Sequence, residues 1–251
     1  MIEPGSQRNA ATSPTFRPRG KWVRLAIGLG AFAVGAGAFA LGWALRPPPV
    51  QPSAVAYGNM RVFTINAHLA TVKPGYVYLA GDSYMELYAP EALPCDREVV
   101  NGGVGGAKSG EYLRFLDRIT LQPRPAAVFL SIGLNNLLKK SNPTSPSAVA
   151  AFRESSDALI RRLGEGGAKV VVIAVPPVPE GVARKFDTAG LEIYNQVLLD
   201  ICAARGCTVR DVFAEARDGV FWLAKPGTSV DGLHLAHLRR YYQAAYADLC
   251  R

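Results

Sequence analysis

Short apolar runs alternate with helical patterns along most of this chain, and this alternation constrains its fold more than any other feature. The first four runs end at glycines or at a proline pair. They occupy residues 76–80, 98–101, 126–132 and 169–175, and residues 208–213 are a weaker fifth candidate. Apolar residues recur at helical spacing within residues 112–119, 149–163, 191–201 and 235–249. Strands that are apolar on both faces must be covered on both sides, so the pattern predicts a three-layer α/β/α domain with about five parallel strands.

The segment before the first predicted strand is rich in proline at its start. Residues 47–52 read Pro-Pro-Pro-Val-Gln-Pro, which cannot continue a helix and predicts an extended spacer. Residues 53–74 show no clean period, and we interpret them as an irregular lead-in or a short edge strand. The predicted divisions are a basic N-terminus (1–24), an apolar segment (25–45), a proline-rich linker with its lead-in (46–75) and the main domain (76–251).

Residues 25–45 contain no charged side chain, and about 20 such residues in a helix cross the hydrocarbon core of a bilayer. Residues 1–46 carry six basic side chains and one acidic one, a net charge of +5. Basic flanks stay in the cytoplasm, so we expect a single-pass inner-membrane anchor that places the main domain in the periplasm. The alternative is a secretory signal peptide, because Ala38-Phe39-Ala40 fits a cleavage site.

Charge and cysteine content limit the partners of the main domain. Beyond residue 46 the chain has 22 basic and 19 acidic residues, a net charge of +3, which does not indicate a nucleic-acid partner. Three histidines and no Cys-x-x-C pair leave little for a metal, and we expect neither a metal nor a cofactor. Cys202 and Cys207 are close enough along the chain to form a disulfide, whereas Cys95 and Cys250 can pair only if the fold brings them together.

Four short blocks contain the candidate catalytic residues. Three of them directly follow predicted strands, and the fourth precedes the last helix. They are Gly81-Asp82-Ser83-Tyr84, Asn101-Gly102-Gly103-Val104-Gly105-Gly106, Gly133-Leu134-Asn135-Asn136 and Asp231-Gly232-Leu233-His234. The carboxyl ends of parallel strands share one rim of a sheet, so the topology brings the four blocks together.

These residue types suit nucleophilic catalysis on an acyl group. A serine hydroxyl needs a base, which predicts Ser83 as nucleophile and His234 as base. An acid three residues earlier, Asp231, can orient the imidazole. The oxyanion of the tetrahedral intermediate needs preformed donors, and we expect these from the amides of Ser83 and Gly106 and from the side chain of Asn135.

The four blocks, in this order, resemble the GDSL/SGNH hydrolase superfamily from residue 76 to the C-terminus. The stretch 101–136 is most similar to the platelet-activating-factor acetylhydrolase-like branch. The resemblance implies a flavodoxin-like fold and a serine esterase with Ser83, Asp231 and His234 as its triad. The chain has Ala107-Lys108 where the family often has Asp-Thr, and Asn136 where it often has Asp. Both differences alter the pocket but remove no catalytic atom.

Three functions are compatible with these residues. The first is hydrolysis of a carboxylic ester with a short acyl group such as acetyl. The second is transfer of the acyl group to a hydroxyl of an envelope glycan, because the same residues serve both reactions. The third is a binding domain without catalysis, which the complete set of catalytic residues argues against. The expected partners are a small-molecule or glycan ester and, through the N-terminal helix, the membrane.

Overall fold

The computed structural model describes residues 53–88, 96–219 and 222–246. They belong to the second of two compact units, Pro52–Arg251. The predicted apolar segment 25–45, the basic N-terminus, Cys95 and Cys250 lie outside the described residues. Among the described helices, none combines the length and the apolar character that a membrane span requires.

A five-stranded parallel sheet forms the middle of the domain, as the apolar runs predict. Its strand order is β2-β1-β3-β4-β6, and every neighbouring pair is parallel. All residues of the two strands β1 and β3 are buried, which explains their lack of polar alternation. The strands are β1 (Val77–Gly81), β2 (Val99–Gly103), β3 (Ala127–Ser131), β4 (Lys169–Ile173) and β6 (Thr208–Arg210).

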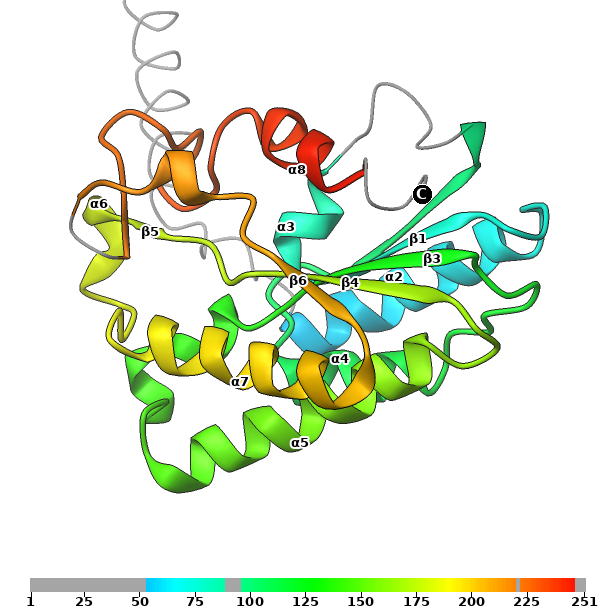
Figure 1. Cartoon of the computed structure of the whole chain (residues 1–251), viewed down its shortest axis with the longest axis horizontal. Coiled ribbons are helices and arrows are strands. Elements are labelled where there is room, and N and C mark those ends of the chain that lie inside the picture. Colours follow the sequence, from blue (N-terminus) through cyan, green and yellow to red (C-terminus); the bar gives the residue numbers. More distant parts are fainter. Residues whose placement is uncertain (1–52, 89–95, 220–221, 247–251) are drawn as a thin grey trace, which may run out of the picture. The chain divides into compact units, whose positions relative to one another are not determined.

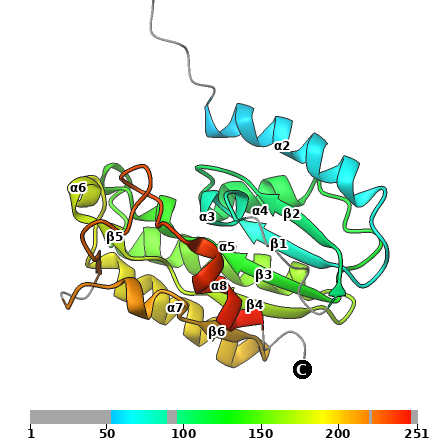
Figure 2. The ribbon, with the colours of Figure 1, turned by 90° about the horizontal axis from the view of Figure 1, so that it is seen from above.

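Helices cover both faces of this sheet, which confirms the predicted three layers (Figure 1). One layer consists of α2 (Ala54–Leu69), α4 (Ser109–Leu116), α5 (Pro146–Leu163) and α7 (Gly190–Arg205). The view from above shows α2 and α7 at opposite edges of the layer (Figure 2). The short α3 (Ser83–Glu86) and α8 (Leu238–Tyr246) lie on the other face.

The prediction of an irregular lead-in or edge strand over residues 53–74 is wrong, because α2 occupies most of that segment. Ser53 caps the helix by accepting a hydrogen bond from the amide of Ala56 at 3.2 Å. Val62, Ile65 and Leu69 are buried in the common core, at the spacing of one helical face. Packing against the sheet therefore stabilises a helix whose sequence has no clear helical period of apolar residues.

The last helix is predicted to begin at residue 235 but begins three residues later. His237 has a φ of 58°, in the left-handed region that a right-handed helix excludes, so α8 starts at Leu238. Tyr242 and Tyr246 then pack against Tyr88 and Phe129, with ring centroids 4.6 and 4.8 Å apart. The remaining short elements are η2 (Leu134–Leu137), η3 (Lys139–Ser141), β5 (Val178–Pro179), α6 (Glu180–Ala183), η4 (Ala214–Ala216) and β7 (Leu223–Ala224).

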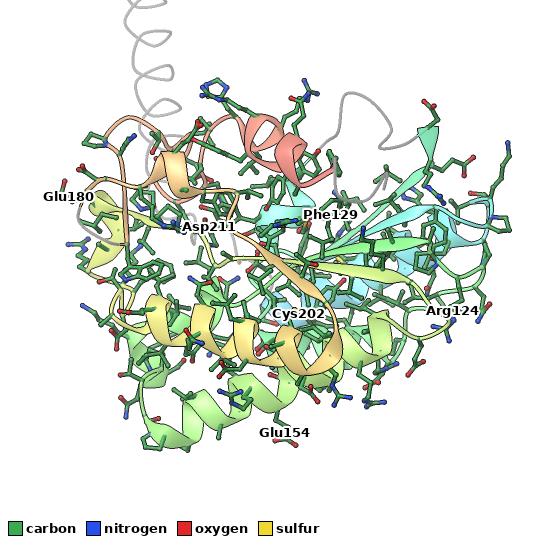
Figure 3. All side chains as sticks on the ribbon, viewed as in Figure 1. Arg124, Phe129, Glu154, Glu180, Cys202 and Asp211 are labelled. Carbon is green, nitrogen blue, oxygen red and sulfur yellow. A yellow bond between two sulfur atoms is a disulfide. The ribbon has the colours of Figure 1, made fainter. Side chains whose placement is uncertain are left out.

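The predicted disulfide between Cys202 and Cys207 is confirmed. Their Cα atoms are 4.5 Å apart and the sulfur atoms are bonded. Gly206 ends α7 in the left-handed conformation, which reverses the chain between the two cysteines. Cys202 is labelled on α7 below the sheet in Figure 3. The bridge thus fixes the turn from α7 into the edge strand β6.

The register of the sheet brings the ends of the strands level with one another. Gly81 pairs with both Gly103 and Ser131, and Ser131 pairs with Ile173. The blocks that follow β1, β2 and β3 must therefore emerge side by side. In Figure 3, Glu180 marks this end of the molecule and Arg124, just before β3, marks the opposite end.

Candidate active site

Ser83 is placed by a close approach between β1 and β3. Gly81 has a φ of 135°, and a Cβ on it would lie 1.8 Å from the carbonyl oxygen of Ser131, so only glycine fits. The chain turns there, and α3 begins at Ser83 with Asp82 as its N-cap. The hydroxyl of Ser83 is consequently presented at the rim of the sheet, half-buried.

The structure connects Ser83, His234 and Asp231 by consecutive hydrogen bonds, although Ser83 and His234 are 151 positions apart in the sequence. His234 Nε2 lies 2.8 Å from Ser83 Oγ, and His234 Nδ1 lies 2.6 Å from Asp231 Oδ2. The second oxygen of Asp231, Oδ1, accepts the amides of Leu233 and His234 at 2.9 and 2.7 Å. The carboxylate is thus oriented by its own loop before it meets the imidazole.

The charge state of Asp231 follows from these bonds. Burial acts to raise its pKa, but the hydrogen bonds from the His234 side chain and from the amides of His234 and Leu233 outweigh burial. Together they lower the pKa of Asp231 to about 2. The carboxylate is therefore ionised at neutral pH, as a partner for an imidazolium must be.

Tyr84 holds the loop of His234 in place, a role that the sequence does not reveal. Its hydroxyl donates to the carbonyl oxygen of Leu233 at 3.1 Å, and its ring centroid lies 5.4 Å from that of His234. Because Tyr84 directly follows Ser83 on α3, one buried side chain connects the helix of the serine to the loop of the histidine.

The three predicted oxyanion donors lie on the three loops that leave the sheet at this rim. Among the described residues, neither the amide of Ser83 nor that of Gly106 donates to a protein acceptor. Gly106 has a φ of 76°, which glycine adopts without strain. The side chain of Asn135 donates to the carbonyl oxygen of Ala107 at 3.2 Å, which connects it to the loop of Gly106. The two loops are therefore held together where donors are needed.

Asp82 is a buried carboxyl group beside the nucleophile. It is 2 % exposed, and its Oδ1 accepts the amide of Tyr84 at 3.0 Å. Burial raises the pKa of Asp82 to about 7, and the bond from Tyr84 opposes this shift only in part. Asp82 thus carries a proton more readily than an ordinary aspartate.

The residues that depart from the family pattern have structural partners. Asn136 accepts the amide of Ser109 at 2.9 Å and donates to its hydroxyl at 3.1 Å. Lys108 donates from Nζ to Ser141 Oγ at 2.7 Å. The side-chain amide of Asn136 therefore holds the start of α4 against the loop of Asn135.

A cavity of about 520 Å³ opens beside His234. Its lining includes both apolar and basic side chains. Its lining comprises Leu87, Tyr88, Val230, His234, Leu235, Ala236, His237, Leu238, Arg239 and Arg240. Its volume is in the range of small-molecule sites. Within the described part of the chain, no group of three or more His, Cys, Asp or Glu side chains could hold a metal ion.

A three-layer α/β/α domain with a hydrogen-bonded Ser-His-Asp triad at the carboxyl ends of its parallel strands is typical of a class of serine hydrolases. The chain belongs to the GDSL-like lipase/acylhydrolase family, whose model matches residues 47–238. It is therefore a carboxylic ester hydrolase of the GDSL/SGNH type, and the resemblance inferred from the four blocks is confirmed.

Solved structures share this fold at low sequence identity. A protein named as a platelet activating factor from Streptococcus pneumonia is 19% identical, with a TM-score of 0.65 over 86% of this chain and 99% of that one. A lipase/acylhydrolase from Enterococcus faecalis is 24% identical, with a TM-score of 0.54 over 69% and 93%. A carbohydrate acetylesterase family member from Sinorhizobium meliloti is 18% identical, with a TM-score of 0.52 over 70% and 99%. Curated proteins give no match.

Proposed function

We propose that this esterase cleaves short acyl esters, acetyl above all, through an acyl-enzyme on Ser83, and that it acts outside the cytoplasm. The observation that carries the proposal is the continuous chain from Ser83 Oγ through His234 to Asp231, with bonds of 2.8 and 2.6 Å. This geometry already satisfies the distances that proton transfer from serine to histidine requires.

In the first half-reaction, Ser83 Oγ attacks the carbonyl carbon of the ester while its proton moves to His234 Nε2. Asp231 stabilises the resulting imidazolium through Nδ1 and keeps the ring in the productive tautomer. The amides of Ser83 and Gly106 and the side chain of Asn135 bind the oxyanion of the tetrahedral intermediate. The carbon–oxygen bond to the alcohol then breaks, and the alcohol leaves with the proton from Nε2.

In the second half-reaction, His234 removes a proton from water, which attacks the acyl-enzyme. The second tetrahedral intermediate uses the same three donors. Its collapse releases the carboxylic acid and returns the proton to Ser83 Oγ. If a glycan hydroxyl replaces water, the same residues perform acyl transfer, so the acceptor decides between the two reactions.

Two observations support a small ester. The cavity of about 520 Å³ beside His234 can accommodate the acyl chain or the alcohol of a small ester. A structural neighbour is a member of a carbohydrate acetylesterase family, which supports acetyl esters on carbohydrate hydroxyls.

The proposed location rests on the N-terminal sequence. Residues 25–45 are uncharged and long enough for a membrane-spanning helix, and six basic side chains flank them on residues 1–46. We propose a single-pass anchor with the esterase domain in the periplasm. A reporter that works only in the periplasm, fused after Arg251, should be active, whereas a reporter that works only in the cytoplasm should be silent. The reverse result would refute the location, and a mature N-terminus near residue 41 would show signal cleavage instead.

The test of the chemistry compares the protein with Ser83→Ala. The purified protein should hydrolyse p-nitrophenyl acetate faster than butyrate and longer esters, and Ser83→Ala should be inactive with an unchanged unfolding temperature. Equal activity of the variant would refute the assignment of Ser83. Addition of acceptor glycans should leave acetate as the main product, whereas an acetylated glycan as the main product would indicate a transferase.

A further inference from the structure

Glu86 lies one helical turn after Ser83 and contacts three groups outside its own helix. Its Oε2 accepts the amide of Gly105, and its Oε1 accepts the hydroxyl of Tyr57. The same Oε1 lies 3.5 Å from Arg61 Nε. The Glu86 side chain is only 18% exposed. The proposed reaction steps give this half-buried carboxylate no task, although it connects α3, the helix of the nucleophile, to the loop that carries Gly106.

Gly105 and Gly106 form the middle of a tight turn. The carbonyl oxygen of Val104 accepts the amide of Ala107 at 3.2 Å, and Gly106 has the positive φ of the third residue in a type II turn. The amide of Val104 is tied to the carbonyl oxygen of Gly81 at 2.9 Å. Glu86 binds the next amide, that of Gly105. The amide of Gly106 is then the first one in this turn that remains for a ligand.

The contacts of Glu86 extend to α2. Arg61 also donates from Nε to the carbonyl oxygen of Gly103 at 3.0 Å and from Nη2 to that of Asn101 at 3.1 Å. Its guanidinium compensates the charge of a carboxylate that is largely removed from water. The bond to Glu86 raises the pKa of the Tyr57 hydroxyl, which therefore stays protonated and continues to donate.

We propose that Glu86 is a positioning residue for the oxyanion hole, and that Tyr57 and Arg61 of α2 hold it in place. The inference rests on the proposed function, because it concerns the Gly106 donor of that reaction. A donor that is fixed before the reaction stabilises the oxyanion more than one that must be ordered during it. Glycine is the residue with the least backbone restraint, so a turn of two glycines needs such an external anchor.

The first test compares Glu86→Ala with Glu86→Gln in hydrolysis of p-nitrophenyl acetate. Glu86→Ala should lower kcat by about tenfold with KM changed less than about twofold, because the turn acts mainly in the transition state. Glu86→Gln keeps an oxygen that can accept the Gly105 amide and should recover part of the loss. The matched control is Glu111→Ala, which removes a carboxylate that accepts the amide of Lys108 at 2.9 Å and should leave kcat near the wild-type value.

The second test uses Gly105→Ala. A Cβ on Gly105 would lie 2.9 Å from Glu86 Oε2 and would displace the carboxylate. This substitution should lower kcat in the wild-type protein but have little further effect in Glu86→Ala, because the contact is already lost. It also carries the test if Glu86→Ala does not fold.

Three results would overturn the inference. They are wild-type kcat in folded Glu86→Ala, a change confined to KM, or additive effects of Glu86→Ala and Gly105→Ala. In each case, a wild-type protein that is active and a Ser83→Ala variant that is inactive show that the proposed function itself stands. If the wild-type protein hydrolyses no ester, the proposed function fails first and the role of Glu86 fails with it.

Discussion

Replacement of Asp231 by asparagine should disable the site through the tautomer of His234. Oδ1 of Asp231 accepts two amides, at 2.9 and 2.7 Å, so the oxygen of an asparagine must occupy that position. The NH₂ group then takes the place of Oδ2, 2.6 Å from His234 Nδ1. Nδ1 must accept this bond, which places the proton on Nε2, where it faces Ser83 Oγ. A protonated Nε2 cannot remove the proton of the serine.

In an unrelated serine hydrolase, this tautomer change lowers kcat by about ten thousandfold. The Asp231 side chain is 51% exposed, so water can restore part of the orientation, and we expect a loss of about a thousandfold. That corresponds to about 4 kcal/mol in the activation free energy. His234→Ala should lose more, because it removes the base altogether.

The measurement is kcat and KM for p-nitrophenyl acetate at pH 7.5, alongside thermal unfolding of the same samples. KM should change little, because both carboxylate oxygens are bonded to protein atoms. If folded Asp231→Asn keeps kcat within about tenfold of the wild type while Ser83→Ala is inactive, the tautomer argument is refuted.

Three further results are expected. Asn135→Ala should lower kcat by about a hundredfold with little change in KM, and a change mainly in KM would exclude Asn135 as a transition-state donor. The raised pKa of Asp82, about 7, favours the protonated carboxyl in the folded state, so its contribution to stability is present below about pH 4 and is lost as the pH rises through 7. The difference in unfolding free energy between the wild type and Asp82→Asn in urea should therefore change by up to about 4 kcal/mol between pH 4 and 8, and a constant difference would contradict the raised pKa. Replacement of Cys202 and Cys207 by serine should lower the unfolding free energy by about 2 kcal/mol, the loop-entropy value for so short a loop, and an unchanged urea midpoint would contradict it.

The sheet could be predicted because its signal is local. A strand buried on both faces must be apolar throughout, and the runs before Gly81 and Gly133 meet that condition. Once the strands are known to be parallel, their ends share one rim, and the blocks that follow them must converge. The topology therefore predicts that Ser83 and Asn135 lie close to each other. Asp231 and His234 are three residues apart, so their contact is also a local property.

Contacts between distant segments could not be predicted in the same way. Tyr84 reaches Leu233 across 149 residues, and Glu86 reaches Tyr57 across 29. Each contact depends on the side-chain direction at both ends, which a periodicity does not specify. The start of α8 depends on the left-handed conformation of His237, a residue type that adopts it only in a suitable environment.

The sequence did not predict α2, because both faces of this helix mix polar and apolar residues. Its inward face carries Tyr57 and Arg61 in one half and apolar residues in the other, because the first half meets Glu86 and the carbonyl oxygens of β2. Its outward face carries Met60 and Phe63, which are 67% and 79% exposed. Both faces are therefore mixed, and the helical period is blurred. Residues that break the expected pattern of a helix often have a specific contact elsewhere in the fold. In α2 these residues are Tyr57 and Arg61, and their contact is Glu86.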